Sequence, residues 1–174
     1  MLKILIIDDN LYFTKTLINF FSKSEKELGL CTISTNGKEA LRELEDNIFD
    51  IILLDLKIPQ YNGIKILDII SKQYIDNYRN SVIVISSYYE HFTKIMNNPC
   101  IYGLVNKLDG VSNILKEVEM LANIKEADIS EKKIRNLIIS ELSKINYNFL
   151  YSGTRYLVES IMLIIQNKNF ENIN

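Results

Sequence analysis

The chain has 174 residues, 47% of them hydrophobic, and its 20 basic and 22 acidic side chains leave a net charge of −2. This balance excludes a general attraction for nucleic acids or anionic membranes. The two cysteines, Cys31 and Cys100, form no metal-binding pair, and no apolar run approaches the roughly 18 residues of a membrane span. The length predicts one domain, or one domain plus an appendage. Because the N-terminus shows no signal-peptide pattern, we expect a cytoplasmic protein.

Strand-like runs and helix-like segments alternate five times between residues 1 and about 124. The strands are expected at 2–7, 31–35, 50–55, 82–86 and 103–106, and their nearly continuous apolar character is typical of strands buried on both faces. A segment with helical spacing follows each strand. The first contains the stripe Leu17, Phe20, Phe21 and Leu28, and the others run from Gly37 to about Asn47, from Asn62-Gly63 onward, over about 88–97 and from Val111 onward. Right-handed crossovers then predict an α/β fold, a doubly wound five-stranded parallel sheet of flavodoxin-like order 2-1-3-4-5.

The last fifty residues carry two further apolar stripes with helical spacing. Residues 125–130 are polar and predict a short linker between a domain at 1–124 and a helical segment at 131–174. We expect two helices there, the first capped by Ser130 or Asp128 and the second following a turn near Ser152-Gly153. Because two such helices cannot build an independent core, they must pack on the first domain, dimerise or belong to a longer unit.

Polar side chains stand where the apolar strands end. Asp8 and Asp9 follow the first strand, Asp55 ends the third, Ser86 ends the fourth and Lys107 follows the fifth. Because the carboxyl ends of parallel strands meet at one edge of a sheet, these side chains should line one crevice. Acids gathered there repel one another unless a divalent cation lies among them. The pattern therefore predicts a site for Mg²⁺ and a phosphoryl group.

Three of these side chains suit the transfer of a phosphoryl group. The carboxylate of Asp55 can attack phosphorus and form an acyl phosphate. The ammonium of Lys107 and the hydroxyl of Ser86 can then contact the phosphoryl oxygens. Each residue alone has a structural explanation as a turn, cap or surface residue. The coincidence at four strand ends favours the phosphoryl site.

The remaining acids suit the binding of a cation. We expect Asp9 to bind Mg²⁺ directly and Asp8 to bind it directly or through water. Asp55 and the backbone carbonyl of Lys57 would supply further oxygen ligands. These residues form the predicted metal site.

Four segments carry a resemblance to a known family. They are ILIIDDN (4–10), ILLDLKIPQYNG (52–63), VIVISSY (82–88) and GLVNKLDG (103–110). Together they resemble the response-regulator receiver domain of two-component signalling over essentially all of residues 1–124. The acidic pair of that family matches Asp8 and Asp9, its phosphoacceptor matches Asp55, and its switch hydroxyl and signature lysine match Ser86 and Lys107.

The resemblance implies a phosphoacceptor switch rather than an enzyme acting on other substrates. Such domains take a phosphoryl group from a histidine kinase or a phosphotransfer protein, require Mg²⁺, and slowly release phosphate. An aspartate-nucleophile phosphohydrolase is the less favoured alternative, because those enzymes carry a second aspartate two residues after the nucleophile and this chain has Lys57 there. A homodimer through the face formed by residues 88–122 is a further expectation.

Two positions depart from the family pattern. Leu104 stands where the family has its switch aromatic, and the neighbouring Tyr102 is a candidate replacement. Leu108 stands where the family has a proline, often after a cis bond. A cis bond without proline costs about 3 kcal/mol, so we expect a trans bond and an altered loop. These departures keep open a degenerate receiver that acts as a protein-interaction scaffold.

The C-terminal segment carries a second resemblance. The sequence KIRNLIISELSKINYNFLYSGTRYLVESIMLI (133–164) resembles the beginning of the effector domain in the sporulation master regulator family of endospore-forming bacteria. It implies a partial effector domain and a role in transcription regulation. No recognition helix follows in this sequence, so DNA binding would require a longer effector domain.

Overall fold

The computed structural model describes residues 1–24, 28–87, 91–144 and 152–171. The chain divides into two compact units, Met1–Lys125 and Glu126–Asn174. The strands are β1 (Lys3–Ile7), β2 (Leu30–Ser34), β3 (Ile51–Asp55), β4 (Val82–Ser86) and β5 (Ile101–Asn106). The helices are α1 (Leu11–Phe21), α2 (Gly37–Asp46), α3 (Gly63–Gln73), α4 (Ile75–Tyr78), α5 (Phe92–Ile95), α6 (Val111–Lys144) and α7 (Ser152–Glu171).

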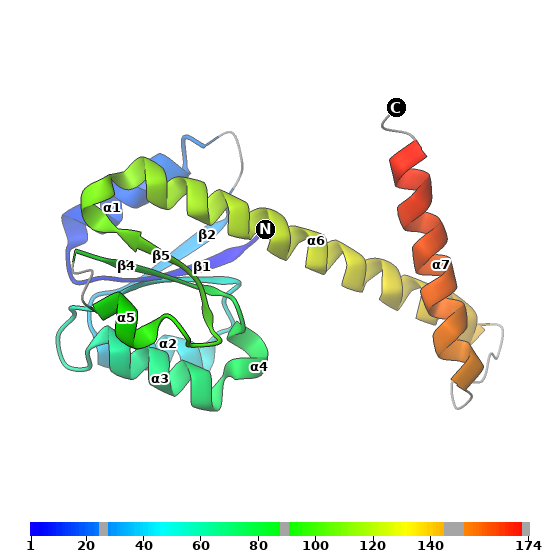
Figure 1. The fold of residues 1–174 in the computed structure, drawn as a ribbon, viewed down its shortest axis with the longest axis horizontal. Coiled ribbons are helices and arrows are strands. Elements are labelled where there is room, and N and C mark those ends of the chain that lie inside the picture. The colour runs from blue at the N-terminus through cyan, green and yellow to red at the C-terminus, as the bar shows by residue number, and fades with distance from the viewer. Residues whose placement is uncertain (25–27, 88–90, 145–151, 172–174) are drawn as a thin grey trace. The chain divides into compact units, whose positions relative to one another are not determined.

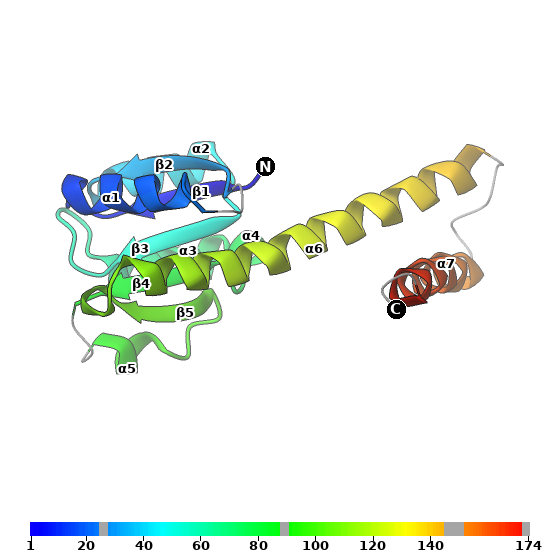
Figure 2. The same cartoon turned by 90° about the horizontal axis from the view of Figure 1, so that it is seen from above.

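The first unit is built on one parallel sheet of five strands. The strand order is β2-β1-β3-β4-β5 (Figure 2), which confirms the predicted fold class. Figure 1 shows α1 and the first part of α6 on one face of the sheet and α2 to α5 on the other. Every residue of β3 and β4 is buried, whereas the edge strands β2 and β5 are only partly covered. The continuous Ile, Leu and Val runs of the inner strands therefore reflect two covered faces.

The strand register brings the carboxyl ends of four strands to one edge. Ile7 pairs with Leu54, Asp55 with Ile85, and the last residues of β4 and β5 also pair with each other. Asp8 continues the ladder beyond β1, because its N–H donates to the carbonyl of Ser34 at 3.0 Å. Side chains that follow these strands consequently emerge side by side, as the sequence pattern predicts.

Asparagines begin the three helices that leave this edge after β1, β2 and β3. The side chains of Asn10, Asn36 and Asn62 each accept a hydrogen bond from the backbone N–H of the third residue of α1, α2 and α3. Asparagine is among the best N-cap residues because its side-chain oxygen satisfies a helix N–H that has no partner within the helix. The caps fix where each connection turns into its helix.

Two of the predicted helices are shorter in the structure. The helix expected at about 88–97 is reduced to Phe92–Ile95 in the described residues, and residues 88–90 lie outside them. The first helix ends at Phe21, so Leu28 is buried beyond it and is not part of a helical stripe. Phe20, which belongs to the same predicted stripe, is 39% exposed. The short helix α4 was not predicted.

The structure also replaces the predicted linker with a helix. Residues 125–130 lie within α6, which runs without interruption from Val111 to Lys144, so neither Ser130 nor Asp128 is an N-cap. The segment contains neither Gly nor Pro, so nothing in its sequence ends the preceding helix. Ser152 and Gly153, where a turn was expected, are instead the first two residues of α7. Residues 145–151 are outside the described residues.

The second unit has a sparse apolar core. Among its described residues, Val158 and Met162 are the buried hydrophobic side chains, whereas Leu137 and Tyr156 are 62% and 73% exposed. An ion pair joins its two helices: Arg135 of α6 donates to both carboxylate oxygens of Glu159 of α7, at 2.7 and 3.2 Å. This small core agrees with the expectation that two helices of this size lack an independent core. No helix within the described residues is long and apolar enough to cross a bilayer.

Gly63 keeps the loop after β3 close to that strand. Its N–H donates to the carbonyl of Leu56 at 3.1 Å, and a Cβ at this position would lie 2.2 Å from the backbone oxygen of Asp55. We predict that Gly63→Ala lowers the free energy of unfolding by about 1–3 kcal/mol, because the strand backbone must shift to relieve the overlap. Urea unfolding followed by circular dichroism measures this change.

Gly103→Ala is the matched control for this prediction. A Cβ at Gly103 would meet only the flexible carboxylate of Glu117, at 3.2 Å. We expect a smaller loss there, because that side chain can move aside. Equal losses for the two variants would contradict the steric explanation of Gly63.

Candidate functional site

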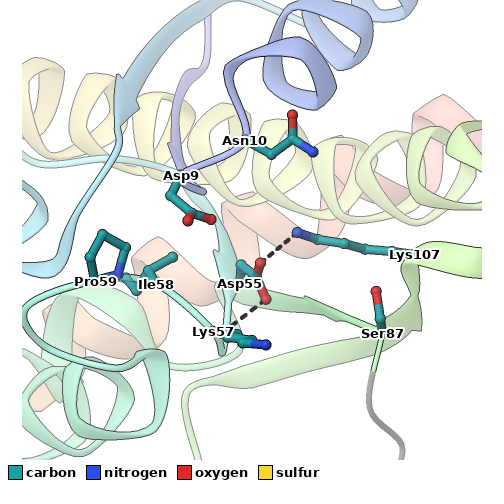
Figure 3. A pocket seen from close by; sticks show the side chains of 8 residues that line it. All are labelled: Asp9, Asn10, Asp55, Lys57, Ile58, Pro59, Ser87 and Lys107. Carbon is teal, nitrogen blue, oxygen red and sulfur yellow. Dashed lines mark hydrogen bonds and ion pairs between the residues drawn. The ribbon is translucent and has the colours of Figure 1, made fainter.

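A pocket of about 540 Å³ opens at the carboxyl edge of the sheet. Figure 3 shows its lining, to which the ends of β1, β3, β4 and β5 and the loop after β3 all contribute. The lining residues are Asp9, Asn10, Asp55, Lys57, Ile58, Pro59, Ser87 and Lys107. The pocket therefore lies where the sequence analysis places the site.

Asp55 lies at the floor of this pocket with both carboxylate oxygens engaged. Its Oδ1 accepts a hydrogen bond from the backbone N–H of Lys57 at 3.1 Å. Its Oδ2 lies 2.5 Å from the Nζ of Lys107. These two contacts hold the Asp55 carboxylate in a fixed orientation. The side chain is 8% exposed and lines the pocket (Figure 3).

Lys107 places one positive charge between two buried carboxylates. Its Nζ also lies 2.6 Å from the Oδ2 of Asp8 and 4.8 Å from the centre of the Phe13 ring. Burial alone would lower the pKa of Lys107, but the hydrogen bonds and charges of Asp55 and Asp8 outweigh burial and raise it. The ammonium therefore stays protonated at neutral pH.

Asp8 is the most deeply buried of the three acids. Its Oδ1 accepts the N–H of Asn10 at 2.9 Å, and its side chain has no exposed surface. Burial raises the pKa of Asp8, and the neighbouring Lys107 only partly offsets this effect. Its Oδ2 is buried and pairs with the Nζ of Lys107.

Three carboxylates gather at this edge of the sheet. One oxygen from each of Asp8, Asp9 and Asp55 lies within 4.8 Å of the others, and Asp9 is exposed. Carboxylate oxygens are the ligands that Mg²⁺ and Ca²⁺ prefer. One lysine cannot neutralise three acids, so this donor set fits a divalent cation.

Ser86 and Ser87 occupy different environments. Ser86 is fully buried at the end of β4 and is not among the residues that line the pocket, whereas Ser87 is. The predicted Ser86 hydroxyl is therefore next to the pocket but covered. Sequence reasoning missed Ser87 and Asn10. The place of Asn10, between the acidic pair and a helix start, was the signal that could have identified it.

The two departures from the family pattern are also resolved. Leu104 is partly buried and packs against the core cluster. Leu108 is 79% exposed, and the bond before it is trans, as predicted. The loop continues as a single 3-10 turn, Lys107–Asp109, in which the Asn106 side chain accepts the N–H of Leu108 at 2.8 Å.

Comparison with known proteins agrees with this geometry. EvgA, a DNA-binding transcriptional activator of Escherichia coli (strain K12), is 30% identical over 120 residues, which are 68% of this chain and 56% of that protein. A protein-glutamate methylesterase/protein-glutamine glutaminase of Pyrococcus horikoshii is 27% identical over 156 residues, which are 83% of this chain and 41% of that protein. The chain thus spans about half the length of the curated relatives it matches.

Solved structures share the fold. The response regulator protein TrrA of Thermotoga maritima, in complex with Mg(2+)-BeF, gives a TM-score of 0.58 at 21% identity, over 70% of this chain and 99% of that chain. The family model described as "Response regulator receiver domain" matches residues 4–119, about two thirds of the sequence. The chain therefore belongs to the response regulator receiver domain family, the receiver part of two-component response regulators.

Proposed function

We propose that this receiver accepts a phosphoryl group on Asp55 from a histidine kinase or a phosphotransfer protein. The observation that carries the proposal is the contact of 2.5 Å between the Oδ2 of Asp55 and the Lys107 ammonium at the floor of an open pocket. A fixed carboxylate with a cation beside it suits attack on phosphorus, because negative charge develops there during transfer.

In the proposed reaction, a carboxylate oxygen of Asp55 forms a bond to phosphorus. The bond between phosphorus and the donor histidine nitrogen breaks, and its electron pair stays on the imidazole. The N–H of Lys57 orients the carboxylate, and Lys107 lies close enough to follow the incoming charge. Phosphoryl oxygens would then compete with Asp8 and Asp55 for the lysine.

Asp8, Asp9, Asp55 and the backbone carbonyl of Lys57 would hold Mg²⁺. The three carboxylates within 4.8 Å of one another support this assignment, as does the complex of TrrA, a protein of the same fold, with Mg(2+)-BeF. When bound, the ion would screen the repulsion between the acids and an approaching phosphoryl group.

The switch would work through local electrostatics. A phosphoryl group on Asp55 would draw Ser86 and Lys107 toward it and shift the face of residues 88–110 between two arrangements. A change in homodimerisation through the 88–122 face is one readout of such a shift. Leu104 lies within the 88–110 face and packs against the core, so its packing would have to change when that face shifts.

We further propose that residues 131–174 begin an effector domain of the sporulation type, attached to a receiver domain at 1–124. The exposed apolar side chains of the second unit support a role within a larger assembly. EvgA is a DNA-binding transcriptional activator, and this chain would act in the cytoplasm as a transcription regulator of related design. Binding to DNA would require further effector residues.

An enzymatic role is the alternative that the comparisons raise. The methylesterase/glutaminase relative matches over 41% of its own length, so its activity does not extend to this chain by likeness alone. A phosphohydrolase role is disfavoured by Lys57 at the second position after Asp55. We therefore propose a non-enzymatic switch, and we expect no turnover of a generic phosphate monoester.

Asp55→Asn tests the phosphoacceptor directly. We expect the variant to take up no phosphoryl group from radiolabelled acetyl phosphate or a phosphorylated kinase, because the amide is a poor nucleophile. Its circular dichroism spectrum should stay that of the folded protein, since the change is nearly isosteric and removes one of three repelling charges. Asp46→Asn changes an exposed acid outside the pocket and should label normally. Label on the Asp55→Asn protein would refute the assignment.

Lys107→Met tests the charge balance of the pocket. Without Mg²⁺ we expect the free energy of unfolding to fall by about 2–4 kcal/mol, because two buried carboxylates lose their counter-charge. Excess MgCl₂ should restore much of the loss by binding the native state. Lys72→Met, which removes an exposed ion pair to Asp68, should cost about 0–1 kcal/mol with or without the salt. Urea unfolding measures all four cases, and equal behaviour of the variants would refute the prediction.

A beryllium fluoride complex separates a working switch from a degenerate scaffold. This mimic binds an aspartate carboxylate much as a phosphoryl group does. For a working switch we expect chemical-shift changes in the amide NMR spectrum over residues 86–107 on addition of Mg²⁺ and beryllium fluoride. No change at residues 86–107 would favour the scaffold, in which Leu104 and Leu108 have uncoupled the site from that face.

A further inference from the structure

The Lys107 ammonium has a third neighbour besides its two carboxylates. Its Nζ lies 4.8 Å from the centre of the Phe13 ring, within the roughly 6 Å over which an aromatic face attracts a cation. Phe13 lies in the first turn of α1 and is half-buried. The ring therefore faces the ammonium without bringing a formal charge of its own.

Two hydrogen bonds from backbone N–H groups to side-chain oxygens connect the start of α1, where Phe13 lies, to the acidic site. The Oδ1 of Asp8 accepts the N–H of Asn10 at 2.9 Å, and the Oδ1 of Asn10 accepts the N–H of Phe13 at 3.0 Å. Lys107 then contacts both the Phe13 ring and the Oδ2 of Asp8. The contacts among these four residues form a closed circuit, so the positions of the Phe13 ring and the Asp8 carboxylate are fixed relative to each other.

We propose that Phe13 is a positioning residue, whose ring keeps the Lys107 ammonium at the pocket when a divalent cation engages the carboxylates. The inference rests on the proposed function, because it assigns Phe13 a part in the same phosphoryl site. Asp8 and Asp55 form ion pairs with Lys107. They are also two of the three acids that could hold a divalent cation.

The physical reason is competition for the same two carboxylates. A cation bound by Asp8 and Asp55 weakens their attraction for the lysine and adds its own repulsion. The Phe13 ring carries no charge that the cation could neutralise, so its attraction for the ammonium persists. Without it, Lys107 would spend more time turned away from the phosphoryl group.

Substitutions at position 13 separate the electronic role from simple packing. Phe13→Leu keeps an apolar side chain but removes the π-face, whereas Phe13→Tyr keeps it. Mono-, di- and trifluorinated phenylalanines at position 13 withdraw electron density stepwise with little change in shape. Phe20→Leu is the matched control, because Phe20 lies on the same helix and is 39% exposed.

The first readout is the rate constant of phosphorylation by acetyl phosphate in excess MgCl₂. We expect a decrease of roughly 2- to 20-fold for Phe13→Leu, as the usual strength of a cation–π contact implies. The fluorinated series should decrease in graded order, and Phe13→Tyr and Phe20→Leu should match the unchanged protein.

The second readout needs no phosphodonor. Reductive methylation of Lys107 in excess MgCl₂, measured by mass spectrometry, reports how often the amine leaves the pocket. We expect faster methylation in Phe13→Leu and a graded increase through the fluorinated series. A series in which fluorination has no effect, or equal methylation of Phe13→Leu and Phe20→Leu, would overturn the inference.

The two readouts also separate this inference from the proposed function. If the unchanged protein takes up no phosphoryl group, the assignment of Asp55 fails, and the methylation series alone decides the role of Phe13. If the protein is phosphorylated normally in every Phe13 variant and methylation is unchanged, Asp55 stands and the role of Phe13 is refuted.

Discussion

Repulsion between carboxylates at the edge of the sheet is the constraint on which the site depends. Asp8, Asp9 and Asp55 each offer an oxygen within 4.8 Å of the others, and two of them are buried, where charge is poorly screened. Lys107 balances only part of that charge. The fold therefore holds more negative than positive charge at this edge, which favours the binding of a cation there. The parallel sheet supplies the rigid frame that keeps the acids from moving apart.

Most of the sheet and the place of the site could be predicted from the sequence because both follow from simple periodicity. Buried parallel strands are short apolar runs, and whatever follows them must emerge at a common edge. The helices were harder to predict. The stretch about 88–97 has helical spacing, but only Phe92–Ile95 is helical in the described residues. The polar composition of 125–130 suggested a linker, yet polar residues without Gly or Pro also continue a helix.

The finer parts of the site could not be predicted because they depend on side-chain directions across elements distant in sequence. Ser86 and Ser87 are adjacent in the chain, but the end of β4 turns one inward and the other toward the pocket. Nothing in the sequence sets Phe13 apart, and its ring gains a charged neighbour through the reach of Lys107 from the turn after β5. Asn10 is of a residue type that commonly caps helices. It also lines the pocket and donates its backbone N–H to the Asp8 carboxylate.

The cap of α3 has a chemical consequence. Asn62-Gly63 is a dipeptide type prone to deamidation, in which the glycine backbone nitrogen bonds to the asparagine side-chain carbonyl carbon, the bond from that carbon to the amide nitrogen breaks, and ammonia leaves as a succinimide forms. In the native chain, the Gly63 N–H is held by Leu56 at 3.1 Å and the Asn62 Oδ1 by the N–H of Lys65 at 2.9 Å. Both bonds must open before the two groups can react. The native hydrogen bonds of this cap therefore oppose deamidation in the loop that follows Asp55.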